Sequence, residues 1–87
     1  MNKVKICGIT NIEDALLCAK LKVDFIGFIF YKKSPRFIDP EDAKDISKML
    51  ANFSIKKVGV FVDESSNYIN SIGEKVNLDY AQLHGEE

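Results

Sequence analysis

The sequence predicts an α/β fold in which four parallel strands alternate with three helices. Two observations predict it: short β-type runs alternate with segments of helical periodicity, and the central strand runs are apolar on both faces. Strands of that kind are buried on both sides, as in a parallel sheet covered by helical crossovers. The 87 residues, 46% of them hydrophobic, supply apolar material for one domain and not for two.

The first strand is expected at residues 3–7, where Gly8 ends it. A helix is expected at about residues 11–22, opened by a capping box in which Thr10 bonds forward and Glu13 bonds back. The helix has a broad apolar face that suits packing against a sheet. That face consists of Ile12, Ala15, Leu16, Leu17, Cys18 and Ala19.

The second strand is expected at residues 25–30, an apolar run that a long loop follows. Asp39 then has the position of an N-cap, and Pro40 that of the first residue of a helix reaching about Ala51. Both features are typical of a helix start, so the second helix is predicted to begin there.

The third strand is expected at residues 58–62. We interpret Asp63, which follows it, as a cap at the start of the third helix. That helix is indicated by apolar side chains at helical spacing, and residues 80–84 then form the fourth strand, ended by Gly85. The spaced residues are Tyr68, Ile69, Ile72 and Val76.

This order leaves two architectures, a small doubly wound sheet and half of a (β/α)8 barrel. A whole barrel needs at least ~200 residues, so a barrel sequence of this length would be incomplete. Residues 85–87 stand where a fourth helix is expected to begin. We therefore expect residues 1–87 to form a single incomplete domain.

Composition argues against several classes of function. Twelve Lys and Arg against thirteen Asp and Glu give a net charge of −1 without a basic cluster, which disfavours nucleic acid as a partner. The N-terminus alternates polar and apolar residues unlike a secretion signal, and no apolar run approaches the ~20 residues of a membrane span. Cys7 and Cys18 are too few for a disulfide scaffold and match no zinc spacing, so we expect a cytoplasmic protein.

Four residues with chemical potential follow the predicted strands: Cys7, Arg36, Asp63 and His84. In both architectures function is located at the carboxyl ends of parallel strands, so these residues are expected on one rim. Asp63, as a helix cap, is the least expected of them to take part in chemistry. Cys18 lies within a helix face, where we expect it to pack.

Each of the other three has a structural and a functional interpretation. Cys7 is either a small buried hydrophobe or a base or nucleophile whose thiolate a nearby Arg36 would favour. Arg36, the only arginine, is either a solvated loop charge or a ligand for a carboxylate or phosphate. His84, the only histidine, is weak evidence by itself. Lys32 and Lys33 are expected to be solvated.

Four segments together resemble the successive strand-end motifs of the N-(5′-phosphoribosyl)anthranilate isomerases. They are VKICGIT at residues 4–10, GFIF with SPRFI at residues 27–38, VGVF at residues 58–61 and QLHG at residues 82–85. The resemblance covers the whole chain in the right order and spacing. It implies the N-terminal half, βαβαβαβ, of a (β/α)8 TIM barrel.

The resemblance also implies a reaction, an Amadori rearrangement in tryptophan biosynthesis that uses neither a cofactor nor a metal. Such a reaction needs a base and an acid on opposite sides of the sugar. By resemblance Cys7 is the base, Arg36 binds the carboxylate of the anthranilate and His84 lines the substrate pocket. The substrate is a small molecule, phosphoribosylanthranilate.

In the family the general acid is an aspartate on a later strand, and the phosphate site is built from the last loops of the barrel. We therefore expect these 87 residues to be inactive alone, and their open sheet edges to favour self-association. Two alternatives remain. One is a dimeric half-barrel that binds anthranilate or a phosphosugar without catalysis, and the other is a doubly wound redox or signalling module acting through a reactive Cys7.

Overall fold

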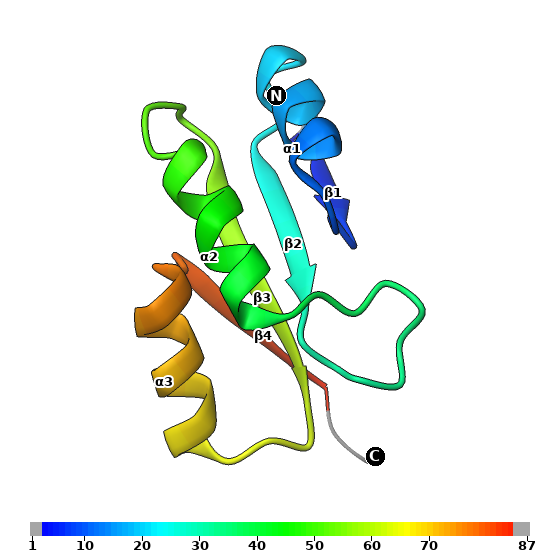
Figure 1. Cartoon of the computed structure of the whole chain (residues 1–87), viewed down its shortest axis with the longest axis vertical. Helices are drawn as coiled ribbons and strands as arrows, with labels where there is room; N and C mark the ends of the chain where they lie inside the picture. Colours follow the sequence, from blue (N-terminus) through cyan, green and yellow to red (C-terminus); the bar gives the residue numbers. More distant parts are fainter. Residues whose placement is uncertain (1–2, 85–87) are drawn as a thin grey trace.

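The computed structural model describes residues 3–84, in which four strands and three helices alternate along the chain (Figure 1). This confirms the expected order of elements, while Gly85 and the expected start of a fourth helix lie outside the described residues. At nine to eleven residues, none of these helices is long and apolar enough to cross a bilayer. The elements are β1 (Lys5–Cys7), α1 (Ile12–Lys20), β2 (Phe25–Ile29), α2 (Pro40–Met49), β3 (Lys56–Val62), α3 (Ser66–Val76) and β4 (Tyr80–His84).

The strands form one parallel sheet in the order β1-β2-β3-β4. A doubly wound sheet reverses its strand order at a switch point, where the chain moves from one half of the sheet to the other. Here each strand lies beside the one before it, so the chain winds in one direction, as in a (β/α)8 barrel. The doubly wound alternative is therefore wrong, and the barrel architecture is confirmed.

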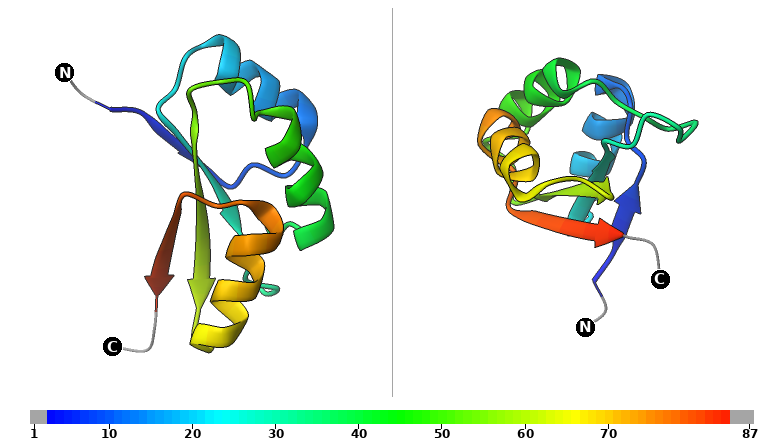
Figure 2. Two further views of the ribbon diagram at one scale, coloured as in Figure 1. Left: turned by 90° about the vertical axis from the view of Figure 1, so that its left-hand side faces the viewer. Right: turned by 90° about the horizontal axis from the view of Figure 1, so that it is seen from below.

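All three helices lie on the same face of the sheet (Figure 2). The residues of the main core come from these helices, from the strands and from the segments that join them. Phe28 of β2, Phe30 directly after β2 and Phe61 of β3 are each at most 1% exposed. The rings of Phe30 and Phe61 stack with centroids 5.4 Å apart. Burying a side chain of this size contributes about 1.5–3 kcal/mol relative to exposure, so these aromatic residues hold β2 and β3 against the helices.

The other face of the sheet, which the helices do not cover, is called the concave face below. Side chains alternate along a strand, and the register places Cys7 beside Gly27 and Gly27 beside Val58, so these three residues share the concave face. The sheet is strongly curled. Nζ of Lys5 in β1 donates a hydrogen bond to Oε1 of Gln82 in β4, although two strands lie between them.

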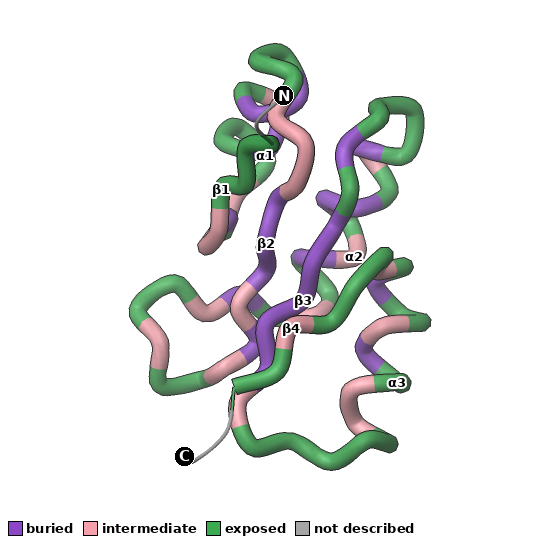
Figure 3. Tube along the Cα trace, turned by 180° about the vertical axis from the view of Figure 1, so that it is seen from behind, coloured by how far each residue is buried: buried purple, intermediate pink, exposed green. Residues whose placement is uncertain are grey.

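Burial falls sharply from the middle of the sheet to its edges (Figure 3). The strands β2 and β3 are mostly buried, whereas β1 and β4 are largely exposed. On α1, Cys18 is buried as expected, but Ile12 and Leu17 of the expected apolar face are exposed. The prediction of a broad buried face on α1 is therefore only partly correct. Within residues 3–84, β1 is an edge strand, so no element lies beyond it to cover the outer side of α1.

The first and third helix starts differ from the expected ones. Asn11, not Thr10, caps α1, and its side chain accepts a hydrogen bond from the N–H of Asp14 at 2.8 Å. Ser65, not Asp63, caps α3 by accepting from the N–H of Tyr68 at 3.1 Å. In both cases the residue with extended backbone directly before the first helical turn is the one whose side chain reaches the third N–H.

The start of the second helix is as expected. Asp39 caps α2 by accepting a hydrogen bond from the N–H of Glu41 at 2.9 Å, and Pro40 occupies the first helical position. Proline is favourable there because the first N–H of a helix has no partner within the helix.

Candidate functional site

Cys7 is the last residue of β1 and lies half-buried on the concave face. Its neighbour on β2 is Gly27, and a Cβ atom added to Gly27 would lie only 2.8 Å from the sulfur of Cys7. That distance is a steric overlap, so the thiol occupies space that only glycine leaves open. Gly27 therefore sets the position of the Cys7 sulfur.

The turn after Cys7 depends on a second glycine. Gly8 has φ +88°, a left-handed conformation that glycine adopts without strain. The N–H groups of Gly8 and Ile9 both donate to the carbonyl oxygen of Gly27, at 3.0 and 3.1 Å, which ties the end of β1 to β2. A side chain at position 8 would also overlap Cδ of Arg36. The absence of a side chain at Gly8 therefore leaves room for Arg36 to pack against the turn.

Arg36 lies in the loop between β2 and α2, which local hydrogen bonds shape. The hydroxyl of Ser34 accepts from the N–H of Arg36 at 3.1 Å, and Phe37 forms a parallel bridge with Ile29 at the end of β2. Nη1 of Arg36 donates to the carbonyl oxygen of Cys7 at 3.3 Å. The guanidinium is exposed and has further N–H donors, in the planar arrangement that suits a carboxylate or phosphate.

His84 ends β4, next to Val62 in the register, and its side chain is exposed. Its carbonyl oxygen accepts from the N–H of Asp63 at 3.1 Å, and its Nε2 lies 2.9 Å from Nε2 of Gln82. Asp63 itself has φ 52° and uses its backbone to fasten β4 to the end of β3. Its expected role as a helix cap is therefore replaced by a role in the strand-end turn.

The four predicted residues thus lie at the carboxyl ends of their strands or in the loops that follow. Cys7 and Arg36 are in direct contact, through the carbonyl oxygen of Cys7. The hydrogen bonds of His84 run instead to Asp63 and Gln82, and Gln82 reaches Lys5 across the concave face. The site therefore has two groups, one at β1 and the loop after β2, the other at β3 and β4.

Three residues of this arrangement were missed from the sequence: Lys5, Gly27 and Gln82. For Lys5 and Gln82 a signal existed, because each stands two residues before a strand-end candidate and so shares its face. A polar residue at such a position on an otherwise apolar strand indicates a role in the site. Gly27 had no such signal, since its importance comes from the sulfur atom on the neighbouring strand.

The second cysteine does not belong to the site. Cys18 is 7% exposed in the core beneath α1. Burial, and to a lesser degree the charge of Asp14, raises the pKa of its thiol, which favours the neutral form. A neutral, buried thiol is a poor nucleophile, so the expected packing role of Cys18 is confirmed.

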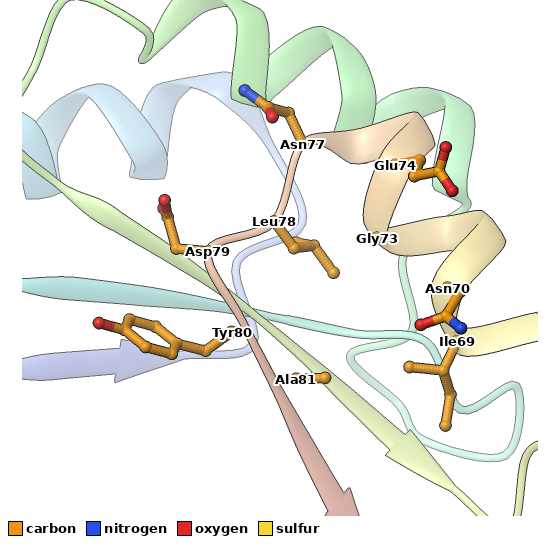
Figure 4. Close-up of a pocket in the computed structure, with 9 residues that line it drawn as sticks. All are labelled: Ile69, Asn70, Gly73, Glu74, Asn77, Leu78, Asp79, Tyr80 and Ala81. Carbon is orange, nitrogen blue, oxygen red and sulfur yellow. The ribbon is translucent and has the colours of Figure 1, made fainter. Parts of the chain in front are cut away.

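A hollow of about 460 Å³ lies at the opposite end of β4, between its first residues and α3 (Figure 4). Leu78, Asp79 and Tyr80 line one side of it. The carboxylate of Asp79 accepts from the N–H of Lys57 at 2.8 Å, which joins the starts of β3 and β4. This hollow is at the amino ends of the strands, where barrel residues serve stability, so it is separate from the site.

Comparison with known proteins gives a consistent result. The family model described as N-(5′-phosphoribosyl)anthranilate (PRA) isomerase matches residues 4–87. The N-(5′-phosphoribosyl)anthranilate isomerases of Geobacter sp. (strain M21) and Thermotoga maritima are 48% and 52% identical to this chain over 87 residues. The chain is covered completely in both alignments and spans 42% of the length of each relative.

Solved structures agree with the sequence relatives. The phosphoribosyl anthranilate isomerase of Thermotoga maritima superposes with a TM-score of 0.94 at 52% identity, covering all of this chain and 42% of that one. A phosphoribosyl anthranilate isomerase in complex with reduced 1-(o-carboxyphenylamino)-1-deoxyribulose 5-phosphate gives the same TM-score and identity and is covered to 44%. The chain therefore belongs to the N-(5′-phosphoribosyl)anthranilate isomerase family and corresponds to the N-terminal part of its members.

Proposed function

We propose that this chain supplies the proton-abstracting part of a phosphoribosylanthranilate isomerase site. The reaction converts N-(5-phosphoribosyl)anthranilate into 1-(2-carboxyphenylamino)-1-deoxyribulose 5-phosphate in tryptophan biosynthesis. One observation carries the proposal: Cys7 and Arg36, 29 residues apart in the sequence, are joined by the hydrogen bond from the guanidinium to the carbonyl oxygen of Cys7. A base and a carboxylate-binding group are thereby held side by side.

The proposed chemistry is an Amadori rearrangement by acid and base. An acid protonates the ring oxygen of the ribosylamine, and the bond between C1′ and that oxygen breaks to leave a protonated Schiff base. The thiolate of Cys7 then removes the proton from C2′, and the electron pair of that C–H bond forms the double bond of an enolamine. Protonation at C1′ and loss of the hydroxyl proton at C2′ give the aminoketose. The steps balance without a cofactor or a metal.

Arg36 has a binding role in this proposal. Its guanidinium can pair in a bidentate manner with the carboxylate of the anthranilate ring. Because the same group is bonded to the backbone of Cys7, the anthranilate end of the substrate would be anchored beside the base. His84, across the concave face, would contact another part of the substrate.

The general acid and the phosphate site are proposed to lie in the part of the family barrel that this chain does not match. The chain spans about 42% of the length of its relatives, and we expect both features on the later strands and loops of the barrel. Loss of a matched acid lowers a rate by ~10²–10⁴. We therefore propose that residues 1–87 are inactive alone, and that the active protein is cytoplasmic, which the free thiols of Cys7 and Cys18 support.

The experiment follows the loss of anthranilate fluorescence as freshly formed phosphoribosylanthranilate is isomerised. It compares the 87-residue chain with the natural polypeptide that contains it. We expect turnover only in the longer polypeptide. Turnover by the 87 residues would contradict the proposed location of the acid, and the absence of turnover in both would contradict the proposed function.

One observation favours a second candidate for the 87-residue chain, a dimeric half-barrel that binds anthranilate or a phosphosugar without catalysis. Apolar side chains are exposed on both edge strands, with Tyr80 56% and Leu83 64% exposed on β4 and Ile6 40% exposed on β1. Binding of anthranilate by a soluble dimer in the absence of turnover by the longer polypeptide would support this candidate.

A further inference from the structure

Two side chains outside the predicted set form a hydrogen-bonded row with His84 across the concave face. Nζ of Lys5 donates to Oε1 of Gln82 at 2.5 Å, and Nε2 of Gln82 lies 2.9 Å from Nε2 of His84. Lys5 stands two residues before Cys7, and Gln82 two residues before His84, so alternation places them on the face of the site. The row connects the strand of the proposed base to the strand of the histidine.

The chemistry of these groups sets the direction of each bond. The ammonium of Lys5 has only donors, so the end of the Gln82 amide that faces it is the carbonyl oxygen. The NH₂ end of Gln82 also has only donors, and it faces His84. Nε2 of His84 must therefore accept, and it carries no proton.

We propose that Lys5 and Gln82 are positioning residues that hold His84 in the tautomer whose proton is on Nδ1. With Nε2 occupied by Gln82, the Nδ1–H group is the remaining donor of the ring. It is offered to an acceptor oxygen of the substrate. This last consequence rests on the proposed function, whereas the tautomer does not.

The ammonium of Lys5 is the source of this selection, although it does not touch His84. An amide can rotate by half a turn and exchange its oxygen and nitrogen, because the two ends have nearly the same shape. With Lys5 present, the rotated amide would point its NH₂ group at an ammonium. Without Lys5, the rotated amide could present its oxygen to His84 and select the other tautomer, with the proton on Nε2.

A carboxylate at position 82 separates this account from a merely structural one. The variant Gln82→Glu has nearly the same shape and still accepts from Lys5, but it has no hydrogen to donate to His84. The ring must then donate through Nε2. The variant therefore reverses the tautomer, whereas a residue that only packs would leave it unchanged.

The experiment is long-range ¹H–¹⁵N NMR of the histidine ring, which distinguishes protonated from unprotonated ring nitrogens. It uses the natural polypeptide that contains these residues, in alkaline buffer, and assigns the signals by their loss in His84→Asn. We expect the proton on Nδ1 in the wild type and on Nε2 in Gln82→Glu. In Lys5→Met we expect a mixture of the two tautomers. Lys5→Arg, which keeps a donor, should restore the wild-type pattern.

The matched control is Lys3→Met. Lys3 is also an exposed lysine near the start of the chain, but its Nζ lies 5.8 Å from the ring centroid of Phe25 and is not bonded to Gln82. Its variant should keep the wild-type tautomer. A proton on Nε2 in the wild type, or an unchanged tautomer in a folded Gln82→Glu, would overturn the proposal. Where Gln82→Glu fails to fold, identical patterns in Lys5→Met and Lys5→Arg would overturn it.

Kinetics separate this proposal from the proposed function. Gln82→Glu is expected to lower kcat/KM about tenfold, the effect of one substrate hydrogen bond lost from the site. If the NMR result holds and the wild type shows no turnover, the proposed function fails and the tautomer assignment stands. If the wild type turns over and Gln82→Glu leaves both the tautomer and kcat/KM unchanged, the tautomer assignment fails and the proposed function stands.

Discussion

At the scale of single residues, the space beside the Cys7 sulfur leaves no room for a side chain at position 27. A Cβ at position 27 would lie 2.8 Å from that sulfur and 3.3 Å from Cα of Cys7 in the backbone of β1. The variant Gly27→Ala is expected to push the thiol off its position, lowering kcat of the longer polypeptide about tenfold or more. Overpacking of this kind costs about 1–3 kcal/mol of stability.

Gly73→Ala is the control for this prediction. Nothing lies within 4 Å of a Cβ at position 73, inside α3, so alanine there should stabilise the protein by about 0.5–1 kcal/mol and leave kcat unchanged. Thermal unfolding and turnover of both variants check the pair. A Gly27→Ala protein with wild-type kcat would show that the thiol position is not critical.

The two thiols are expected to react at different rates. Cys18 is buried, and burial raises the pKa of its thiol and favours the neutral form, whereas Cys7 is only half-buried. Iodoacetamide at pH 8 should therefore modify Cys7 first, which mass spectrometry of peptides from the folded protein would show. Equal rates at the two cysteines would contradict the burial of Cys18.

At the scale of elements, α2 and α3 are joined by an ion pair in which Nζ of Lys75 lies 2.8 Å from Oε2 of Glu41. The hydrogen bond from Lys75 lowers the pKa of Glu41, and the same bond raises that of Lys75. Because the pKa of Glu41 is lower in the folded protein than its ordinary value of 4.5, the pair stabilises the fold above pH 4.5, and this contribution is lost as the pH falls through the pKa of the folded protein. Because the pKa of Lys75 is higher than its ordinary value of 10.5, the pair stabilises the fold below pH 10.5, and this contribution is lost as the pH rises through the raised pKa.

Glu41→Gln should therefore lower Tm slightly at pH 7 and by less at pH 3, because the wild-type carboxylate takes up protons as the pH falls. The effect is small because both side chains are exposed to solvent. Thermal unfolding at the two pH values checks this, with Glu74→Gln as a control that carries the same charge change on α3. A larger decrease of Tm at pH 3 than at pH 7 would contradict the lowered pKa of Glu41.

The order and type of the elements could be predicted because each depends on a local period of apolar residues. The cap of α2, Asp39, could be predicted as well. The caps of α1 and α3 could not, because Thr10 and Asn11, or Asp63 and Ser65, all have side-chain oxygens that can cap a helix. At α3 the backbone decides between the two candidates, because Asp63 is in the left-handed region whereas Ser65 is extended. An N-cap residue typically has the extended conformation, which Asn11 also adopts.

The site divides in the same way. Cys7, Arg36 and His84 could be selected from the sequence because they stand at strand ends or in the loop that follows, and family resemblance supplied their proposed roles. The roles of Gly27, Lys5 and Gln82 depend on atoms in other strands. Gly27 matters through its register with Cys7, and the bond between Lys5 and Gln82 exists only because the sheet curls.

At the scale of the whole molecule, residues 3–84 form a curled sheet that is open at both edges, β1 and β4. Unpaired edges with exposed apolar side chains favour association. We expect the 87-residue chain to form concentration-dependent dimers or larger species in light scattering, and Leu83→Lys, on the exposed strand β4, to weaken them. A monomer at every concentration would contradict this expectation.

The central claim is that the Cys7 thiol is the base of an isomerase site. The most direct measurement is the rate of phosphoribosylanthranilate isomerisation by the natural polypeptide with Cys7→Ala, beside Cys18→Ala as a second cysteine variant. The account predicts a fall in kcat of ~10²–10⁴ for Cys7→Ala and a rate near that of the wild type for Cys18→Ala. Wild-type turnover by a folded Cys7→Ala protein would contradict it.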